Sequence, residues 1–148
     1  MKTKPKILIV ESRFYSEISD HLLLGARKEL DSENILYDVT SVPGTLEVAQ
    51  AISIIKNKSK DGFADIEYDG YIALGCVIRG ETSHYDYVCA ESMRSLNYLA
   101  IKYDLCLGNG ILTCENIEQA QNRARVDLGN KGGDAARASL ALLRLKKT

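Results

Sequence analysis

The sequence has little proline, no long apolar run and no excess of charge of either sign. Its 148 residues include only 2 prolines, and 19 Lys and Arg stand against 20 Asp and Glu, which gives a net charge of −1. With 45% hydrophobic and 26% charged residues, the composition excludes disordered, collagen-like and disulfide-scaffold chains. Because no basic stripe recurs along the chain, we expect no nucleic acid as a partner.

Sequence signals for a membrane, a secretory route or a metal are also missing. The longest apolar runs, such as residues 7–10, fall far short of the roughly 18 residues that a membrane-spanning helix needs. The apolar stretch after the basic amino terminus is too short for a signal peptide, so we expect a cytoplasmic protein without a membrane partner. The cysteines lack CxxC spacing, so we expect no metal site. We interpret them as reduced core residues; they are Cys76, Cys89, Cys106 and Cys114.

The length is typical of one domain, which we expect to span residues 1–148. Apolar runs and two-residue alternation predict strands over residues 6–10, 35–39, 71–78 and 105–107. Apolar residues at three- to four-residue spacing predict helices over 18–30, 46–58, 85–103, 116–126 and 134–145. Between them we expect a loop over 59–69 and a glycine-rich break over 129–133.

This alternation predicts an α/β fold: a three-layer sandwich with a central, four-stranded, mainly parallel sheet and helices on both faces. In such folds, ligands bind beyond the carboxyl ends of the strands. We therefore expect functional residues in the segments that follow the predicted strands, which are 11–15, 41–47, 76–84 and 108–113. The phosphate-binding GxxxxGK[ST] loop and the dinucleotide-binding GxGxxG motif are absent.

The segment from Arg79 to His84 follows the most apolar predicted strand and opens a helix. Its backbone amides and the hydroxyls of Thr82 and Ser83 could hold a phosphate, or one hydroxyl could simply cap the helix. The imidazole of His84 exchanges protons near neutral pH, which fits an acid–base catalyst, although a histidine at a helix start is also common as a surface residue. We assign no role to His21.

Two further side chains have both a functional and a structural interpretation. Phe14 could stack on a planar ring, and the same position fits a hydrophobic staple at the start of a helix. Glu47 lies in the first turn of its predicted helix, where the helix dipole already favours its charge. It has a functional role only if a hydroxylated ligand lies above the sheet.

Several segments together carry a resemblance to a known family. They are Ser12-Arg-Phe14, Val42-Pro-Gly-Thr-Leu-Glu47, the block from Ala73 to Val88, Gly110-Ile-Leu-Thr113, Glu118-Gln-Ala120 and Gly129-Asn-Lys-Gly132. In this order, over about residues 6–143, the chain closely resembles the 6,7-dimethyl-8-ribityllumazine synthase family. The resemblance implies a flavodoxin-like fold and the penultimate step of riboflavin biosynthesis. In that step 5-amino-6-(D-ribitylamino)uracil and 3,4-dihydroxy-2-butanone 4-phosphate give the lumazine, phosphate and water without a cofactor.

The resemblance also implies roles for individual residues. His84 is implied as the catalytic residue that moves protons. The residues implied to bind the ribitylaminouracil are Phe14, Thr45, Leu46, Glu47, Cys76, Val77, Ile78 and Asn109. The residues implied to bind the phosphate are Glu81, Thr82 and Arg123, the last contributed by a neighbouring subunit.

The resemblance implies self-association. The chain departs from the family pattern at two places: residue 109 leaves one side of the pyrimidine stack to a polar side chain or to backbone, and residues 125–128 bear on the assembly state. Asn109 stands where many members place an aromatic residue, and Arg125-Val-Asp-Leu128 replaces a frequent Gly-Thr-Lys-Ala segment. We expect a homopentamer with an active site shared between adjacent subunits, a 60-subunit shell as the alternative, and a functional link to riboflavin synthase. The competing interpretations are a non-catalytic lumazine or flavin carrier, which would need neither His84 nor Arg123, and a phosphosugar-binding module, which leaves Phe14 unexplained.

Overall fold

A computed structural model describes residues 4–60, 62 and 67–148 of the chain. The strands are β1 (Lys6–Ser12), β2 (Leu36–Val42), β3 (Gly70–Ile78) and β4 (Leu107–Cys114). The helices are α1 (Ser16–Ser32), α2 (Leu46–Lys60), α3 (His84–Tyr103), α4 (Ile117–Ala124) and α5 (Lys131–Lys147). Strands and helices thus alternate as predicted, and two helices follow the last strand.

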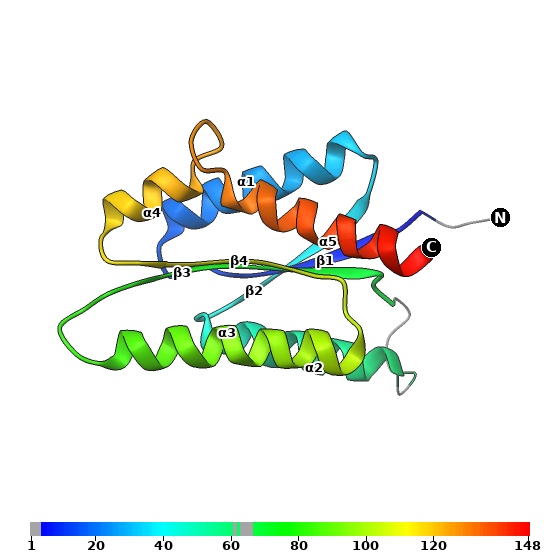
Figure 1. Ribbon diagram of the computed structural model, residues 1–148, viewed down its shortest axis with the longest axis horizontal. Helices are drawn as coiled ribbons and strands as arrows, with labels where there is room; N and C mark the ends of the chain where they lie inside the picture. Colours follow the sequence, from blue (N-terminus) through cyan, green and yellow to red (C-terminus); the bar gives the residue numbers. More distant parts are fainter. Residues whose placement is uncertain (1–3, 61, 63–66) are drawn as a thin grey trace.

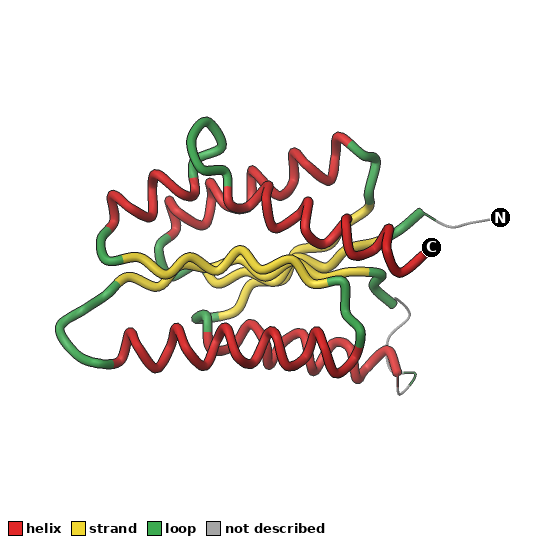
Figure 2. Tube along the Cα trace, in the orientation of Figure 1, coloured by secondary structure: helices red, strands yellow, loops and turns green. Residues whose placement is uncertain are grey.

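The strands form a four-stranded sheet in the order β2-β1-β3-β4, and each neighbouring pair is parallel. Helices α1, α4 and α5 cover one face of this sheet, and α2 and α3 cover the other (Figure 1). Figure 2 shows the sheet almost edge-on between the two helical layers. The predicted three-layer α/β sandwich is confirmed. Because the strands run parallel, their carboxyl ends meet at one edge of the sheet.

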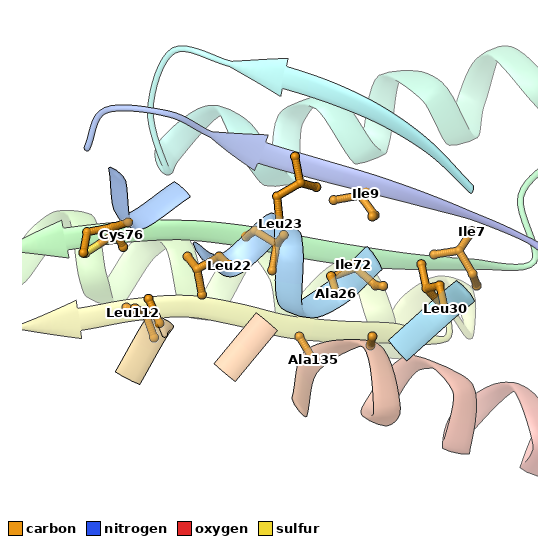
Figure 3. Close-up of a cluster of buried hydrophobic side chains, with 14 of the residues drawn as sticks. Ile7, Ile9, Leu22, Leu23, Ala26, Leu30, Ile72, Cys76, Leu112 and Ala135 are labelled. Carbon is orange, nitrogen blue, oxygen red and sulfur yellow. The ribbon is translucent and has the colours of Figure 1, made fainter. Parts of the chain in front are cut away.

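Each face of the sheet is buried beneath an apolar layer of its own. On the side of α1, the fully buried side chains include Ile9, Leu22 and Ile72, which belong to the apolar cluster drawn in Figure 3. On the other side, Val10 of β1 packs in one cluster with Ile52 of α2. The first seven residues of β3 are buried, as the sequence predicts for a central strand covered on both faces.

The predicted fourth strand exists, but its predicted position over residues 105–107 is wrong. Asp104 ends α3 in a left-handed conformation, and Leu105 is a buried connecting residue rather than a strand residue. The strand itself begins at Leu107, and its ladder with β3 continues to Cys114. Residues 108–113, expected after the strand, therefore lie within it. Its glycines hid the pattern: a Cβ at Gly108 would overlap the backbone of α5.

Other boundaries also differ from those predicted. Strands β1 and β2 extend to Ser12 and Val42, because their parallel ladder continues that far. Helix α2 continues to Lys60, and of the predicted loop over 59–69, residues 61 and 63–66 lie outside the described part of the chain.

The predicted glycine-rich break over 129–133 is too long, because α5 begins at Lys131 and includes Gly132. A Cβ at Gly132 would overlap the carbonyl oxygen of Leu22 in α1. The glycine therefore serves the close packing of α1 against α5, and does not end a helix.

Candidate active site

A cleft of about 290 Å³ lies at the carboxyl edge of the sheet. Two connections, the end of β3 and the first turns of α2 and α3 contribute to it, as expected for a ligand site in a parallel α/β fold. Its lining residues are Phe14, Tyr15, Gly44, Thr45, Leu46, Glu47, Cys76, Val77, Ile78, His84 and Val88. The structure thus brings together His84 and seven of the eight residues predicted to bind the ribitylaminouracil.

Phe14 lies in the short connection between β1 and α1. Its side chain is 74% exposed, and its ring meets Tyr15 edge-on, with 4.9 Å between the ring centroids. A hydrophobic staple would need an apolar partner four residues into the helix, where the chain has the polar residue Ser19. The exposed ring is therefore not a staple, and one of its faces is available at the cleft.

The connection between β2 and α2 contributes a polar wall. The chain bends at Pro43 and Gly44, and the amide of Glu47 donates to the Gly44 carbonyl oxygen at 3.1 Å. Thr45 is buried, whereas Leu46 is 39% exposed and Glu47 is half-buried. The Glu47 carboxylate therefore lies at the cleft with access to a ligand, in the first turn of α2.

The end of β3 forms the floor of the cleft. Cys76 is buried there, and burial raises the pKa of its thiol from 9.0 to about 12, with the neighbouring Cys114 adding to the shift. The thiol is therefore protonated at neutral pH and does not act as a nucleophile. Beyond the end of the β1–β3 ladder at Leu74, β3 pairs only with β4, as far as Ile78. Residues 75–78 thus present a backbone edge toward the cleft.

His84 is the first residue of α3, and its side chain is exposed at the cleft. Ser83 takes the N-cap position without a capping hydrogen bond from its side chain, whereas Thr82 Oγ1 accepts from the His84 amide at 3.3 Å. Glu81 and Thr82 are exposed in the connection before the helix and do not line the cleft itself. The structural interpretation of Thr82 as a helix cap thus has support, while its position next to His84 leaves it available to a ligand.

Arg79 anchors this connection to the neighbouring elements. Its Nε donates to Glu115, just after β4, at 2.6 Å, and its Nη1 reaches Asp86 in the first turn of α3 at 3.3 Å. These bonds to Glu115 and Asp86 raise the pKa of the guanidinium, which stays charged. Arg79 therefore links the end of β3 to Glu115 after β4 and to the first turn of α3.

Asn109 and Arg123 do not join the other predicted residues. They line a separate hollow of about 420 Å³ at β4, together with Lys131 and Asp134. The Asn109 side chain is held by the Ile111 amide, which donates to Oδ1 at 2.9 Å. The Arg123 guanidinium donates to the Gln119 carbonyl oxygen at 3.1 Å and is exposed. Within one chain, then, these two residues belong to a different surface from His84.

Tyr15, Gly44 and Val88 also line the cleft without an individual prediction, although segments 11–15 and 41–47 were expected to carry functional residues. Their positions carried a signal, since Tyr15 follows Phe14 and Val88 lies one helical turn after His84. Among the described residues, no cluster of three His, Cys, Asp or Glu side chains has an arrangement that could hold a metal ion. Nor does any helix of this described part have the length and hydropathy to cross a membrane.

Comparisons with known proteins point to one family. The family model described as 6,7-dimethyl-8-ribityllumazine synthase matches residues 4–147. The 6,7-dimethyl-8-ribityllumazine synthase 1 of Rhizobium meliloti (strain 1021) is 52% identical over 147 residues, which cover 99% of this chain and 95% of that protein. The 6,7-dimethyl-8-ribityllumazine synthase of Agrobacterium fabrum is 51% identical over 146 residues, 98% of this chain and 97% of that one. That of Afipia carboxidovorans is 50% identical over 145 residues, 98% of this chain and 88% of that one.

Proposed function

Because the chain belongs to the 6,7-dimethyl-8-ribityllumazine synthase family, we propose that the cleft at Phe14 and His84 is where it carries out the family's condensation. The chain is a transferase of riboflavin biosynthesis. Its substrates are 5-amino-6-(D-ribitylamino)uracil and 3,4-dihydroxy-2-butanone 4-phosphate, and no cofactor takes part. We place this activity in one domain, residues 1–148, of a cytoplasmic protein. The observation that carries the proposal is that an exposed aromatic ring, a polar turn and an imidazole meet in one cleft.

The pyrimidine substrate fits the floor and one wall of this cleft. The exposed ring of Phe14 stacks on the planar heterocycle. The backbone edge of β3 over residues 76–78 offers donors and acceptors to the uracil edge, where the β1 ladder no longer uses them. The ribityl chain runs along Thr45 and Leu46, and its hydroxyls donate to the Glu47 carboxylate.

The phosphate of the second substrate lies at the start of α3. This helix has 20 residues, and the partial positive charge at its amino end favours an anion beside Glu81 and Thr82. The backbone amides and the Thr82 hydroxyl hold the phosphate oxygens, and Arg123 of an adjacent chain completes the site. A guanidinium fits phosphate oxygens well because it presents two parallel N–H donors.

The chemistry needs few catalytic groups. The aryl amine attacks the ketone and an imine forms with loss of one water, phosphate then leaves, and the second ring closes with loss of a second water. Holding both substrates in one cleft supplies much of the rate acceleration. His84, exposed at the same cleft, moves protons during imine formation and phosphate loss, which contributes up to about 10²- to 10⁴-fold.

The separate position of Arg123 supports a shared active site and therefore an oligomer. A closed ring repeats one contact between unlike surfaces, so that the hollow at β4 of one chain meets the cleft of the next. We propose a homopentamer, with a 60-subunit shell as the alternative. The lumazine that the reaction yields is the substrate of riboflavin synthase, and this makes riboflavin synthase a functional partner.

One assay tests the proposed function. Purified protein is mixed with both substrates, and lumazine fluorescence is followed together with free phosphate. We expect both products to appear in equal amounts, faster than in the mixture without protein. A carrier would bind the lumazine without accelerating its formation, and failure to release phosphate stoichiometrically would overturn the synthase proposal.

A further inference from the structure

A buried carboxylate lies at the end of β1, close in the chain to Phe14. Glu11 is near the carboxyl end of β1, and its side chain is only 4% exposed. Its Oε1 accepts from Arg13 Nη1 at 2.8 Å, and its Oε2 accepts from Ser41 Oγ at 2.8 Å. A buried charge is costly unless it is paired and hydrogen-bonded, and here each oxygen has a partner. Glu11 does not line the cleft, so it does not act on a substrate directly.

Arg13 extends this network from the sheet to helix α1. While Nη1 bonds Glu11, its Nη2 donates to the Ser16 carbonyl oxygen at 3.3 Å and pairs with Asp20. The guanidinium thus spans the whole connection between β1 and α1, from the last strand residues to the first turns of the helix. Phe14 lies inside this span.

The same carboxylate also reaches the second wall of the cleft. Ser41 pairs with Glu11 in the β1–β2 ladder and stands just before the turn that leads to Thr45 and Glu47. Through its two oxygens, Glu11 therefore holds together the connections that carry Phe14 and the ribityl-binding turn.

We propose that Glu11 and Arg13 form a clamp that positions Phe14 for stacking on the pyrimidine. Phe14 needs such support because its side chain is 74% exposed and its ring contact is with Tyr15, which lies in the same connection. The Glu11–Arg13 clamp fixes the backbone on both sides of the ring, so that the ring is in place before the substrate arrives. This inference rests on the proposed function, in which Phe14 is a binding residue.

The clamp affects one substrate more than the other. Arg13→Ala removes the link between β1 and α1, and we expect the KM for the ribitylaminouracil to rise about tenfold, as for a modest misplacement of a binding group. The KM for the butanone phosphate, held at the start of α3, should change less than about twofold. Arg13→Lys keeps a charge for Glu11 but has a single donor group in place of the two-branched fork, so it should recover only part of the loss.

A double-mutant cycle with Phe14 separates positioning from general damage. If Arg13 acts through Phe14, then Arg13→Ala should raise the pyrimidine KM about tenfold in the wild-type background and less than about twofold in the Phe14→Ala background. Equal effects in both backgrounds would overturn the clamp. If Phe14→Ala raises the KM and Arg13→Ala does not, only the clamp fails. If Phe14→Ala itself does not change the pyrimidine KM, both the proposed pyrimidine site and the clamp are wrong.

Two further variants distinguish the positioning effect from a general loss of folding. Glu11→Gln keeps a side-chain oxygen for Ser41 but removes the charge that faces Arg13, so it should reproduce the KM change of Arg13→Ala in a milder form. A Glu11→Gln protein that folds and keeps the wild-type KM would overturn the proposal. Arg144→Ala is the matched control, because Arg144 is also an arginine paired with a glutamate, Glu33, at 3.2 Å, and does not line the cleft. It should leave both KM values unchanged.

Discussion

Arg123 and His84 lie on different surfaces of the chain: His84 lines the cleft at the end of β3, whereas Arg123 lines the hollow beside β4 and α5. The proposed reaction needs a phosphate-binding group close to the proton-transferring imidazole. Within one chain, Thr82 and the amino end of α3 lie beside His84, but the cationic group Arg123 does not, because it belongs to the hollow at β4. In the proposed oligomer, the hollow of an adjacent chain would bring Arg123 to the cleft.

Arg123→Ala tests the phosphate assignment. A charge-assisted contact to an anion contributes about 1.5–3 kcal/mol, so the KM for the butanone phosphate should rise about 10- to 150-fold. The KM for the ribitylaminouracil should change much less. Arg125→Ala is the control, since Arg125 pairs with Asp127 at 2.7 Å near the same turn. Equal changes in both KM values for Arg123→Ala would refute the assignment.

His84→Ala tests the proton-transfer role. Turnover should fall by up to about 10²- to 10⁴-fold, while the dissociation constants of both substrates should stay nearly unchanged. Stopped-flow turnover and equilibrium titration measure the two quantities separately. His21→Ala, on α1 and outside the cleft, should keep full turnover. A loss of binding in His84→Ala would instead mean that His84 is a structural residue.

The shared site predicts the mass of the active species and a form of complementation. Sedimentation should give a particle near five times 16.4 kDa for the pentamer, or near sixty times for the shell. When Arg123→Ala and His84→Ala chains are unfolded and refolded together, some interfaces should combine two intact half-sites and regain activity. Each variant refolded alone is the control. An active monomer, or a mixture no more active than its parts, would contradict the shared site.

Stability should fall at high pH because of the buried Cys76 thiol. Its pKa is about 12 in the folded protein against an ordinary value of 9.0, so above pH 9 the unfolded chain loses this proton first. The contribution is complete below pH 9 and is lost as the pH rises toward 12. The free energy of unfolding, measured by urea titration, should therefore decline less steeply between pH 9 and 11 for Cys76→Ala than for the wild type. Below pH 8 the two proteins should show the same pH dependence, and identical slopes throughout would contradict the prediction.

Gly132→Ala should destabilise the protein although glycine is a poor helix former. Alanine inside a helix usually gains about 1 kcal/mol over glycine. Here, however, its Cβ would overlap the Leu22 carbonyl oxygen, and overpacking of this kind costs about 1–3 kcal/mol. Urea unfolding measures the difference. The control is Gly80→Ala, where a Cβ meets nothing within 4 Å and the free energy of unfolding should change little.

Much of the fold was predictable because the core residues repeat with the period of their elements. The spacing of Ile18, Leu22, Ala26 and Leu30 indicates α1, and all four are fully buried. The continuous apolar run from Tyr71 indicates a strand buried on both faces, which is β3. Strand β4 was misplaced because its face against α5 carries Gly108 and Gly110, and no local pattern shows that a helix backbone lies against them.

The sequence by itself determined the α/β alternation, the family and the residue types of the site, because periodicity and motif spacing are properties of neighbouring positions. The tertiary structure decided which of these residues meet. It joined Phe14, Glu47 and His84 in one cleft because parallel strands end at one edge of the sheet. It also placed Arg123 elsewhere and showed that Glu11 is a buried ion-pair partner rather than a surface carboxylate. Those relationships depend on contacts between segments far apart in the chain, which no local pattern encodes.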